Sequence, residues 1–112
     1  MSARNDSGQF MQIEAASSAI LIRQGRILMI RRRNPPSHDM FAFPGGRAEP
    51  GETPEQTAIR EFEEETGIRA HAPRLFATYD LTTENPGRHF FLSVFLVEAD
   101  AGAVAEARDD AA

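Results

Sequence analysis

Four glutamates stand within five residues of this chain, at positions 61, 63, 64 and 65. On a helix, Glu61, Glu64 and Glu65 fall within one arc of about 100°, because the helix has 3.6 residues per turn. Such like-charge neighbours cost about 0.2–0.5 kcal/mol per pair on an exposed helix. A bound divalent cation such as Mg²⁺ or Mn²⁺ would turn this repulsion into a favourable interaction, since such cations prefer hard oxygen ligands. The spacing therefore indicates a metal site, although a solvated acidic face paired with arginines is the alternative for these residues taken alone.

A longer pattern surrounds these glutamates. Nine residues stand at fixed spacing: Gly46, Glu52, Arg60, Glu61, Phe62, Glu64, Glu65, Gly67 and Ile68. With residue frequencies of roughly 5–7%, a chance match is on the order of 10⁻⁹ per starting position. The segment resembles the Nudix box, the signature of the Nudix (MutT-related) hydrolases. The resemblance covers residues 46–68 directly, and flanking features extend it more weakly over most of residues 15–99.

The resemblance implies a role for each matching residue. The metal ligands would be three carboxylates and one carbonyl: Glu61, Glu64, Glu65 and Gly45. The catalytic set would be Glu64, Glu65, Arg60 and Glu61, with Mg²⁺ or Mn²⁺ as the cofactor. Glu52 and Arg60 would be mainly architectural, because an arginine fork can orient a carboxylate through two hydrogen bonds. Gly46 and Gly67 would likewise hold the structure, and we expect the glycines at 45, 46 and 51 to turn the backbone tightly before the helix.

The reaction implied is hydrolysis of a diphosphate bond by an activated water. The substrate would be a nucleoside diphosphate linked to another group, with ADP-ribose or a nucleotide sugar as the leading prediction. A nucleoside triphosphate pyrophosphatase is the nearest enzymatic alternative. A non-catalytic Nudix domain that binds a nucleotide and regulates a partner is the third hypothesis, although such domains usually lose glutamates that this chain keeps. The sequence leaves the general base open.

Four further residues are candidates for substrate contacts: Arg32, Arg88, His89 and Tyr79. Each has an ordinary structural alternative. The basic triplet at 31–33 is also typical of a solvated strand end, histidines are commonly surface residues, and aromatic residues in strands are more often core than ligand platforms.

The expected fold is α+β. Thr53, Pro54 and Gln56 predict a capped helix start, and Gly67 a left-handed stop, so the helix should span residues 54–66. Strands are predicted over residues 15–23, 26–32, 74–82 and 89–99, with a short extended segment at 41–43. Gln24-Gly25 predicts a hairpin, and residues 84–87 a turn. The resemblance implies a mixed β-sheet sandwiched between helices, an α/β/α arrangement.

The composition predicts a single domain over residues 1–112. With no cysteine, the chain has neither disulfides nor a thiol nucleophile, and it has no apolar run long enough to span a membrane. A net charge of −5 argues against binding to an extended nucleic acid. The composition favours a cytoplasmic protein, the resemblance implies a small nucleotide as the substrate, and a homodimer is left open. Residues 1–11 are expected to be flexible. Residues 103–112 are interpreted as a truncated end or the start of a disordered loop, because Nudix domains normally continue with another strand and helix.

Overall fold

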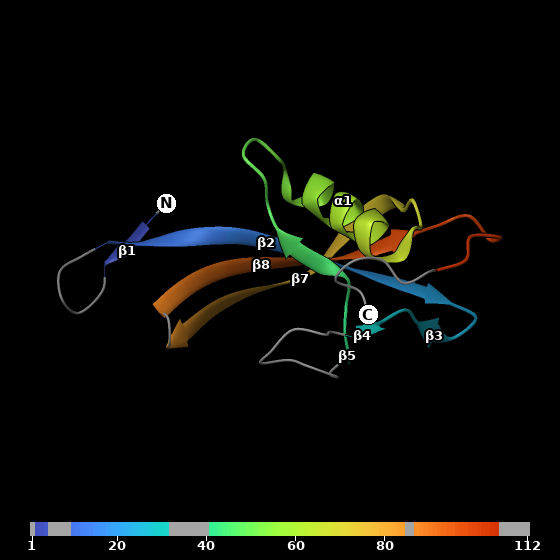
Figure 1. Cartoon of the computed structure of the whole chain (residues 1–112), viewed down its shortest axis with the longest axis horizontal. Helices are drawn as coiled ribbons and strands as arrows, with labels where there is room; N and C mark the ends of the chain where they lie inside the picture. The colour runs from blue at the N-terminus through green and yellow to red at the C-terminus, as the bar shows by residue number, and fades with distance from the viewer. Residues whose placement is uncertain (1, 5–9, 32–40, 85–86, 106–112) are drawn as a thin grey trace.

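The computed structural model describes residues 2–4, 10–31, 41–84 and 87–105 (Figure 1). These residues form eight strands and one helix: β1 Ser2–Arg4, β2 Phe10–Arg23, β3 Arg26–Ile27, β4 Ile30–Arg31, β5 Phe41–Ala42, β6 Gly45–Arg47, α1 Pro54–Thr66, β7 His71–Glu84 and β8 Gly87–Glu98. In this part of the chain no helix is both long and apolar enough to cross a membrane.

The sheet is mixed and is organised around β2. Its strand order is β1-β2-β8-β7, and β3 and β6 also pair with β2. β2 and β8 run parallel, whereas β7 and β8 form an antiparallel pair. A separate two-stranded sheet joins β4 to β5. Figure 1 shows α1 lying across the large sheet, with the loop that follows β6 leading into it.

The helix has the boundaries that the sequence predicts. The Thr53 side chain accepts a hydrogen bond from the Gln56 backbone N–H (3.1 Å), and the Gln56 side chain accepts one from the Thr53 N–H (2.9 Å). Pro54 occupies the start, where a missing N–H costs nothing. Gly67 ends the helix at φ 79°, in the left-handed region. These local signals confirm the prediction for residues 54–66.

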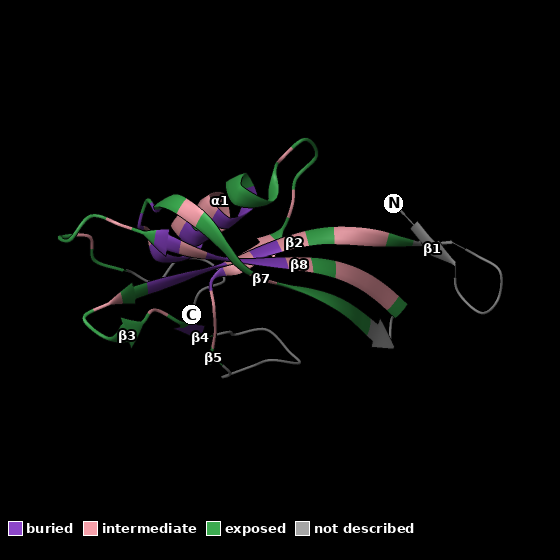
Figure 2. Ribbon diagram, turned by 180° about the vertical axis from the view of Figure 1, so that it is seen from behind, coloured by how far each residue is buried: buried purple, intermediate pink, exposed green. Residues whose placement is uncertain are grey.

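The core lies between α1 and the sheet. It consists of Ala19, Leu21, Ala58, Phe62, Ile68, Ala70, Phe95 and Val97. Figure 2 shows the buried residues gathered beneath the helix, while the described parts of β7 and β8 away from the helix are mainly intermediate or exposed. The α+β class and the mixed sheet are confirmed. Within the described residues one helix covers one face, so the second helix layer implied by the resemblance stays a prediction.

Several strand boundaries differ from those predicted. β2 begins at Phe10 rather than at residue 15, and β7 and β8 are each longer at their N-terminal ends. The strand predicted over 26–32 is two short strands, because the chain changes partner: β3 pairs with β2, and β4 with β5. The hairpin at Gln24-Gly25 is confirmed, with both residues at positive φ.

The N-terminal segment also differs from the sequence expectation. Residues 2–4 and 10–12 pair with one another as strands, whereas the composition favoured a loose segment over residues 1–11. Residues 5–9 lie outside the described part of the chain, as do residues 106–112 at the other end. The flexibility of residues 1–11 and the interpretation of residues 103–112 stay predictions.

Candidate metal and substrate site

An ion pair joins the loop before α1 to the helix itself. Arg60 Nε donates to Glu52 Oε2 (2.6 Å), and Arg60 Nη2 donates to Glu52 Oε1 (3.0 Å). Glu52 Oε1 also accepts from the Glu49 backbone N–H (2.8 Å) and from the Thr57 hydroxyl (2.9 Å). The Arg60 hydrogen bonds, followed by that from Glu49, lower the pKa of Glu52 to about 2. Glu52 in turn raises the pKa of Arg60, so both groups stay charged.

The same guanidinium reaches the acidic side of the helix. Arg60 Nη1 donates to Glu61 Oε2 at 2.9 Å and lies 3.3 Å from both carboxylate oxygens of Glu64. Its Nη2 also donates to the Arg47 carbonyl at 3.0 Å, which ties β6 to the helix. Arg60 therefore links Glu52, two of the predicted metal ligands and the strand beside them.

Glu65 lies differently from its neighbours. The sequence placed it on the acidic arc with Glu61 and Glu64, but its side chain is buried and only 8% of the residue is exposed. Its Oε1 accepts a hydrogen bond from the Gly45 backbone N–H at 3.0 Å. Burial of this carboxylate is compatible with stability because a backbone donor satisfies it. The contact also brings Gly45, the predicted carbonyl ligand, next to the helix.

The glycine pair, Gly45 and Gly46, lets β6 approach the side chains of the helix closely and does not form a turn. Gly45 and Gly46 lie in β6, which pairs antiparallel with β2, so the predicted tight turn at these positions is wrong. A Cβ added to Gly46 would lie 2.5 Å from the Glu61 carboxyl carbon. Only a residue without a side chain lets the Glu61 carboxylate pack against the strand. The turn occurs later, at Gly51, whose φ of 84° favours glycine.

The donor set fits a hard divalent cation. Glu61 and Glu64 both contact one cationic nitrogen of Arg60, so a single positive centre can be shared by the two carboxylates. The described residues contain no preformed group of three acidic or histidine side chains around one point. Glu64 is 56% exposed, which gives its side chain freedom to reorient toward a cation. Carboxylate and carbonyl oxygens are the ligands that Mg²⁺ and Mn²⁺ prefer.

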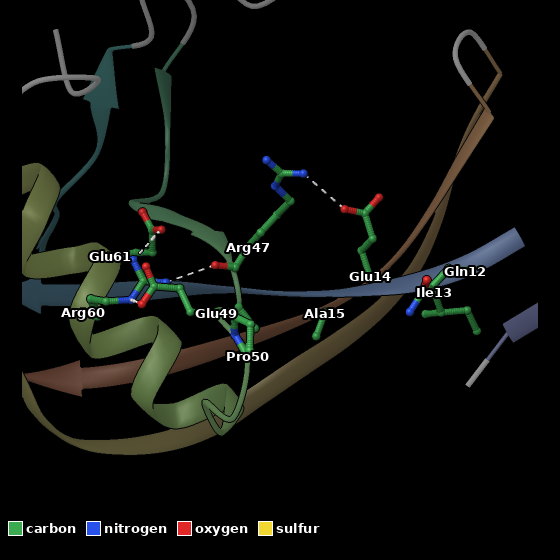
Figure 3. Close-up of a pocket in the computed structure, with 10 residues that line it drawn as sticks. Gln12, Ile13, Glu14, Ala15, Arg47, Glu49, Pro50, Arg60 and Glu61 are labelled. Atoms are coloured by element: carbon green, nitrogen blue, oxygen red, sulfur yellow. Dashed lines mark hydrogen bonds and ion pairs between the residues drawn. The ribbon is translucent and has the colours of Figure 1, made fainter.

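A cleft of about 820 Å³ opens beside these residues. It is lined by β2 from Gln12 to Ala15, by the segment from Arg47 to Pro50, and by Arg60 and Glu61 (Figure 3). Glu14 projects into it and accepts a hydrogen bond from Arg47 Nη1 at 3.2 Å. We call this space the ionic cleft. Sequence reasoning missed Glu14 and Arg47, which are 33 residues apart and carry no local signal.

A second, more apolar pocket lies further along β2 and β6. Its lining residues are Ala16, Ser17, Ser18, Met29, Phe41, Ala42, Phe43, Gly45, Gly46 and Leu92. The glycine pair therefore borders this pocket, while the next residue, Arg47, borders the ionic cleft. The two spaces flank the strand that contacts Glu61 and Glu65.

Three of the four predicted substrate residues lie on the antiparallel pair β7 and β8. Arg88 donates to Glu14 through Nε (2.9 Å) and Nη2 (2.6 Å), so it contacts a residue that lines the ionic cleft. His89 contacts Asp80 on the neighbouring strand. Tyr79 is half exposed on β7, which β8 separates from β2. Arg32 lies outside the described residues.

Comparison with known proteins assigns this architecture to a family. A model of the NUDIX domain matches residues 11–112. The chain is 34% identical over 102 residues to the ADP-ribose pyrophosphatase of Methanocaldococcus jannaschii, covering 91% of this chain and 60% of that protein. It is 40% identical over 82 residues to the 8-oxo-dGTP diphosphatase of Escherichia coli, covering 70% and 61%. The chain thus spans about three fifths of the length of these two curated relatives.

A solved structure shows the same arrangement. The MutT NUDIX hydrolase from Burkholderia pseudomallei superposes with a TM-score of 0.79 at 31% identity, over 88% of this chain and 75% of that one. The likeness therefore extends well beyond the 23 residues from 46 to 68.

Proposed function

Because this chain belongs to the NUDIX family, we propose that it is a Mg²⁺- or Mn²⁺-dependent hydrolase of a nucleoside diphosphate linked to another group. ADP-ribose or a nucleotide sugar is the proposed substrate class. The main observation behind the proposal is that the Arg60 guanidinium contacts Glu52, Glu61 and Glu64. These contacts lie beside β6, the strand that contains Gly45 and Gly46. Two members of this set, Arg60 and Glu61, also line a cleft large enough for a nucleotide.

In this proposal the acidic side of α1 holds the cation. Glu61, Glu64 and Glu65 would be its carboxylate ligands, with the Gly45 carbonyl beside them. When bound, the cation would lower the pKa of a water and offset the charge of the diphosphate. The contact between Arg60 and Glu52 holds the helix against the preceding loop, with Glu61 at the edge of the ionic cleft. Glu65 contributes to the same end through its hydrogen bond with the Gly45 N–H.

The two spaces beside β6 suit the two ends of such a substrate. The pocket containing Phe41, Phe43 and Met29 offers apolar and aromatic surface for a nucleobase. The ionic cleft offers charged hydrogen-bonding groups for a polar end. A diphosphate bridging the two would pass the glycine strand, next to Glu61.

A nucleoside triphosphate pyrophosphatase is the second candidate. It is favoured by the 40% identity to the E. coli 8-oxo-dGTP diphosphatase, which exceeds the 34% identity to the archaeal ADP-ribose pyrophosphatase, although over a shorter stretch.

A hydrolysis panel tests these alternatives. ADP-ribose, two nucleotide sugars, a dinucleoside polyphosphate and nucleoside triphosphates are each incubated with Mg²⁺, with Mn²⁺ and with EDTA. We expect metal-dependent release of a nucleoside monophosphate, fastest from ADP-ribose or a nucleotide sugar. Preference for triphosphates would select the second candidate. Turnover of no substrate, together with nucleotide binding, would instead favour a non-catalytic regulatory domain.

A further inference from the structure

We propose that the ionic cleft is the subsite for the uncharged, hydroxyl-rich group attached to the nucleoside diphosphate, and that Glu14 and Arg47 bind its hydroxyl groups. This inference rests on the proposed function and deepens it. It names a sugar, rather than a further phosphate, as the ligand of this cleft.

The position of the cleft supports this assignment. One side is formed by Arg60 and Glu61, at the proposed reaction centre, and the other by β2 at Glu14. Figure 3 shows Glu14 and Arg47 pointing toward one another above β2, away from the helix. A substrate whose diphosphate lies at Glu61 would therefore extend its second group toward Glu14.

Glu14 is held in a fixed orientation. Arg88 donates to both of its oxygens, at 2.6 and 2.9 Å, and lies 4.9 Å from the centre of the Phe90 ring. Two parallel hydrogen bonds fix a carboxylate more strictly than a single ion pair does. The Arg88 hydrogen bonds also lower the pKa of Glu14. Glu14 is therefore an ionised acceptor at neutral pH.

The hydrogen-bonding positions that remain open on Glu14 and Arg47 match those of a hydroxyl group. A carboxylate has about four acceptor positions, and Glu14 uses three of them for Arg47 and Arg88. Arg47 has a side chain that is 63% exposed, and within the described residues that side chain donates only through Nη1, to Glu14. An available acceptor thus lies beside available donors. A sugar hydroxyl both donates and accepts, so it can use both.

A terminal phosphate would fit this cleft less well. The lining contains the guanidiniums of Arg47 and Arg60 and three carboxylates, those of Glu14, Glu49 and Glu61. A phosphate group mainly accepts hydrogen bonds, so it could use the two arginines but would meet the larger negative charge of the three glutamates. Like charges brought together in a partly enclosed space repel one another. The lining therefore favours a neutral group over an anionic one.

The test compares two substrates that share a nucleoside diphosphate. Steady-state kinetics are measured for ADP-ribose and for ATP with the parent, Glu14→Gln and Arg47→Met. Arg69→Met is the matched control, because that side chain is 81% exposed and lies outside the lining of the cleft. We expect kcat/KM for ADP-ribose to fall about 10–100-fold in both variants, mainly through KM, as for a lost charged hydrogen bond. With ATP the variants should stay within about twofold of the parent.

Equal losses for ADP-ribose and ATP would overturn the inference, because they would place Glu14 and Arg47 on the shared part of the substrate. Unchanged ADP-ribose kinetics would overturn it as well. Calorimetry separates this failure from failure of the proposed function. If the parent binds ADP-ribose without hydrolysing it, the subsite still requires that ADP-ribose bind about tenfold more tightly than ADP, and that Glu14→Gln remove this difference. Equal binding of the two ligands by the parent would contradict the subsite.

Discussion

Arg60 binds both carboxylate oxygens of Glu52, through Nε at 2.6 Å and Nη2 at 3.0 Å. The two residues are eight positions apart, so their contact closes the loop that leads into α1 against the helix. Because the same guanidinium also touches Glu61 at 2.9 Å, the position of the loop and the orientation of a proposed metal ligand are coupled. A change in either partner should therefore affect the loop and the ligand together.

Arg60→Lys tests this coupling. A lysine keeps the positive charge but cannot form the two-pronged contact with Glu52 and reach Glu61 as well. We expect kcat/KM to fall about 10–100-fold and the Mg²⁺ concentration for half-maximal activity to rise, as is typical when a ligand's supporting contact is removed. Activity is measured across a Mg²⁺ titration, with Arg69→Lys as the control. A variant with the parent's Mg²⁺ dependence would argue against the coupling.

The free energy of unfolding at acid pH should depend on the charge of Glu52. Its pKa is lowered from 4.5 to about 2 in the folded protein, chiefly by Arg60. A lowered carboxyl pKa gives stability that is present above the unfolded-state value and lost as pH falls through the folded-state value. Glu52→Gln should thus be less stable than the parent at pH 7, and the difference should shrink between about pH 4.5 and pH 2.

Urea denaturation at a series of pH values measures this difference. Glu55→Gln is the control for loss of one carboxylate, because Glu55 is exposed in the first turn of the same helix. A gap between parent and Glu52→Gln that stayed constant from pH 7 to pH 2 would rule out Glu52 as the group responsible.

The helix and its caps were predictable because their signals are local. Thr53, Gln56 and Gly67 act on backbone groups within a few residues, so the sequence sufficed to define both ends of α1. The break between β3 and β4 was not predictable, because it depends on which strands the chain pairs with. The burial of Glu65 was not predictable for the same reason, since its partner is the Gly45 N–H on a strand 20 residues earlier.

The ionic cleft was missed for a related reason. Glu14 meets Arg88 only because β2 and β8 run parallel, which brings together residues 74 positions apart. The sequence did single out Arg88, but as a substrate contact rather than as the anchor of another side chain. The spacing of residues along the chain predicts which side chains share one face of a helix. Contacts between residues on neighbouring strands can be predicted only when the register of the sheet is known.

Removal of one carboxylate tests the metal assignment directly. Glu64→Gln takes away a ligand and its charge, so we expect kcat to fall at least about 10²-fold, since the cation stabilises transition-state charge by several kcal/mol. In EDTA the variant should be as stable as the parent or slightly more so, because a like-charge pair with Glu61 is removed. With millimolar Mg²⁺ the parent's Tm should rise more than that of the variant. Equal Tm shifts would place the cation elsewhere.

Gly46→Ala tests whether close approach of the strand controls Glu61. The added Cβ would lie 2.5 Å from the Glu61 carboxyl carbon and 2.7 Å from its Oε1, so the carboxylate must move away. We expect activity to fall at least about tenfold with the fold retained, because a small displacement of a catalytic group is costly. Gly102→Ala is the matched control, since a Cβ there would have no neighbour within 4 Å. Circular dichroism and kinetics of both variants decide the point, and full activity in Gly46→Ala would show that Glu61 need not pack against the strand.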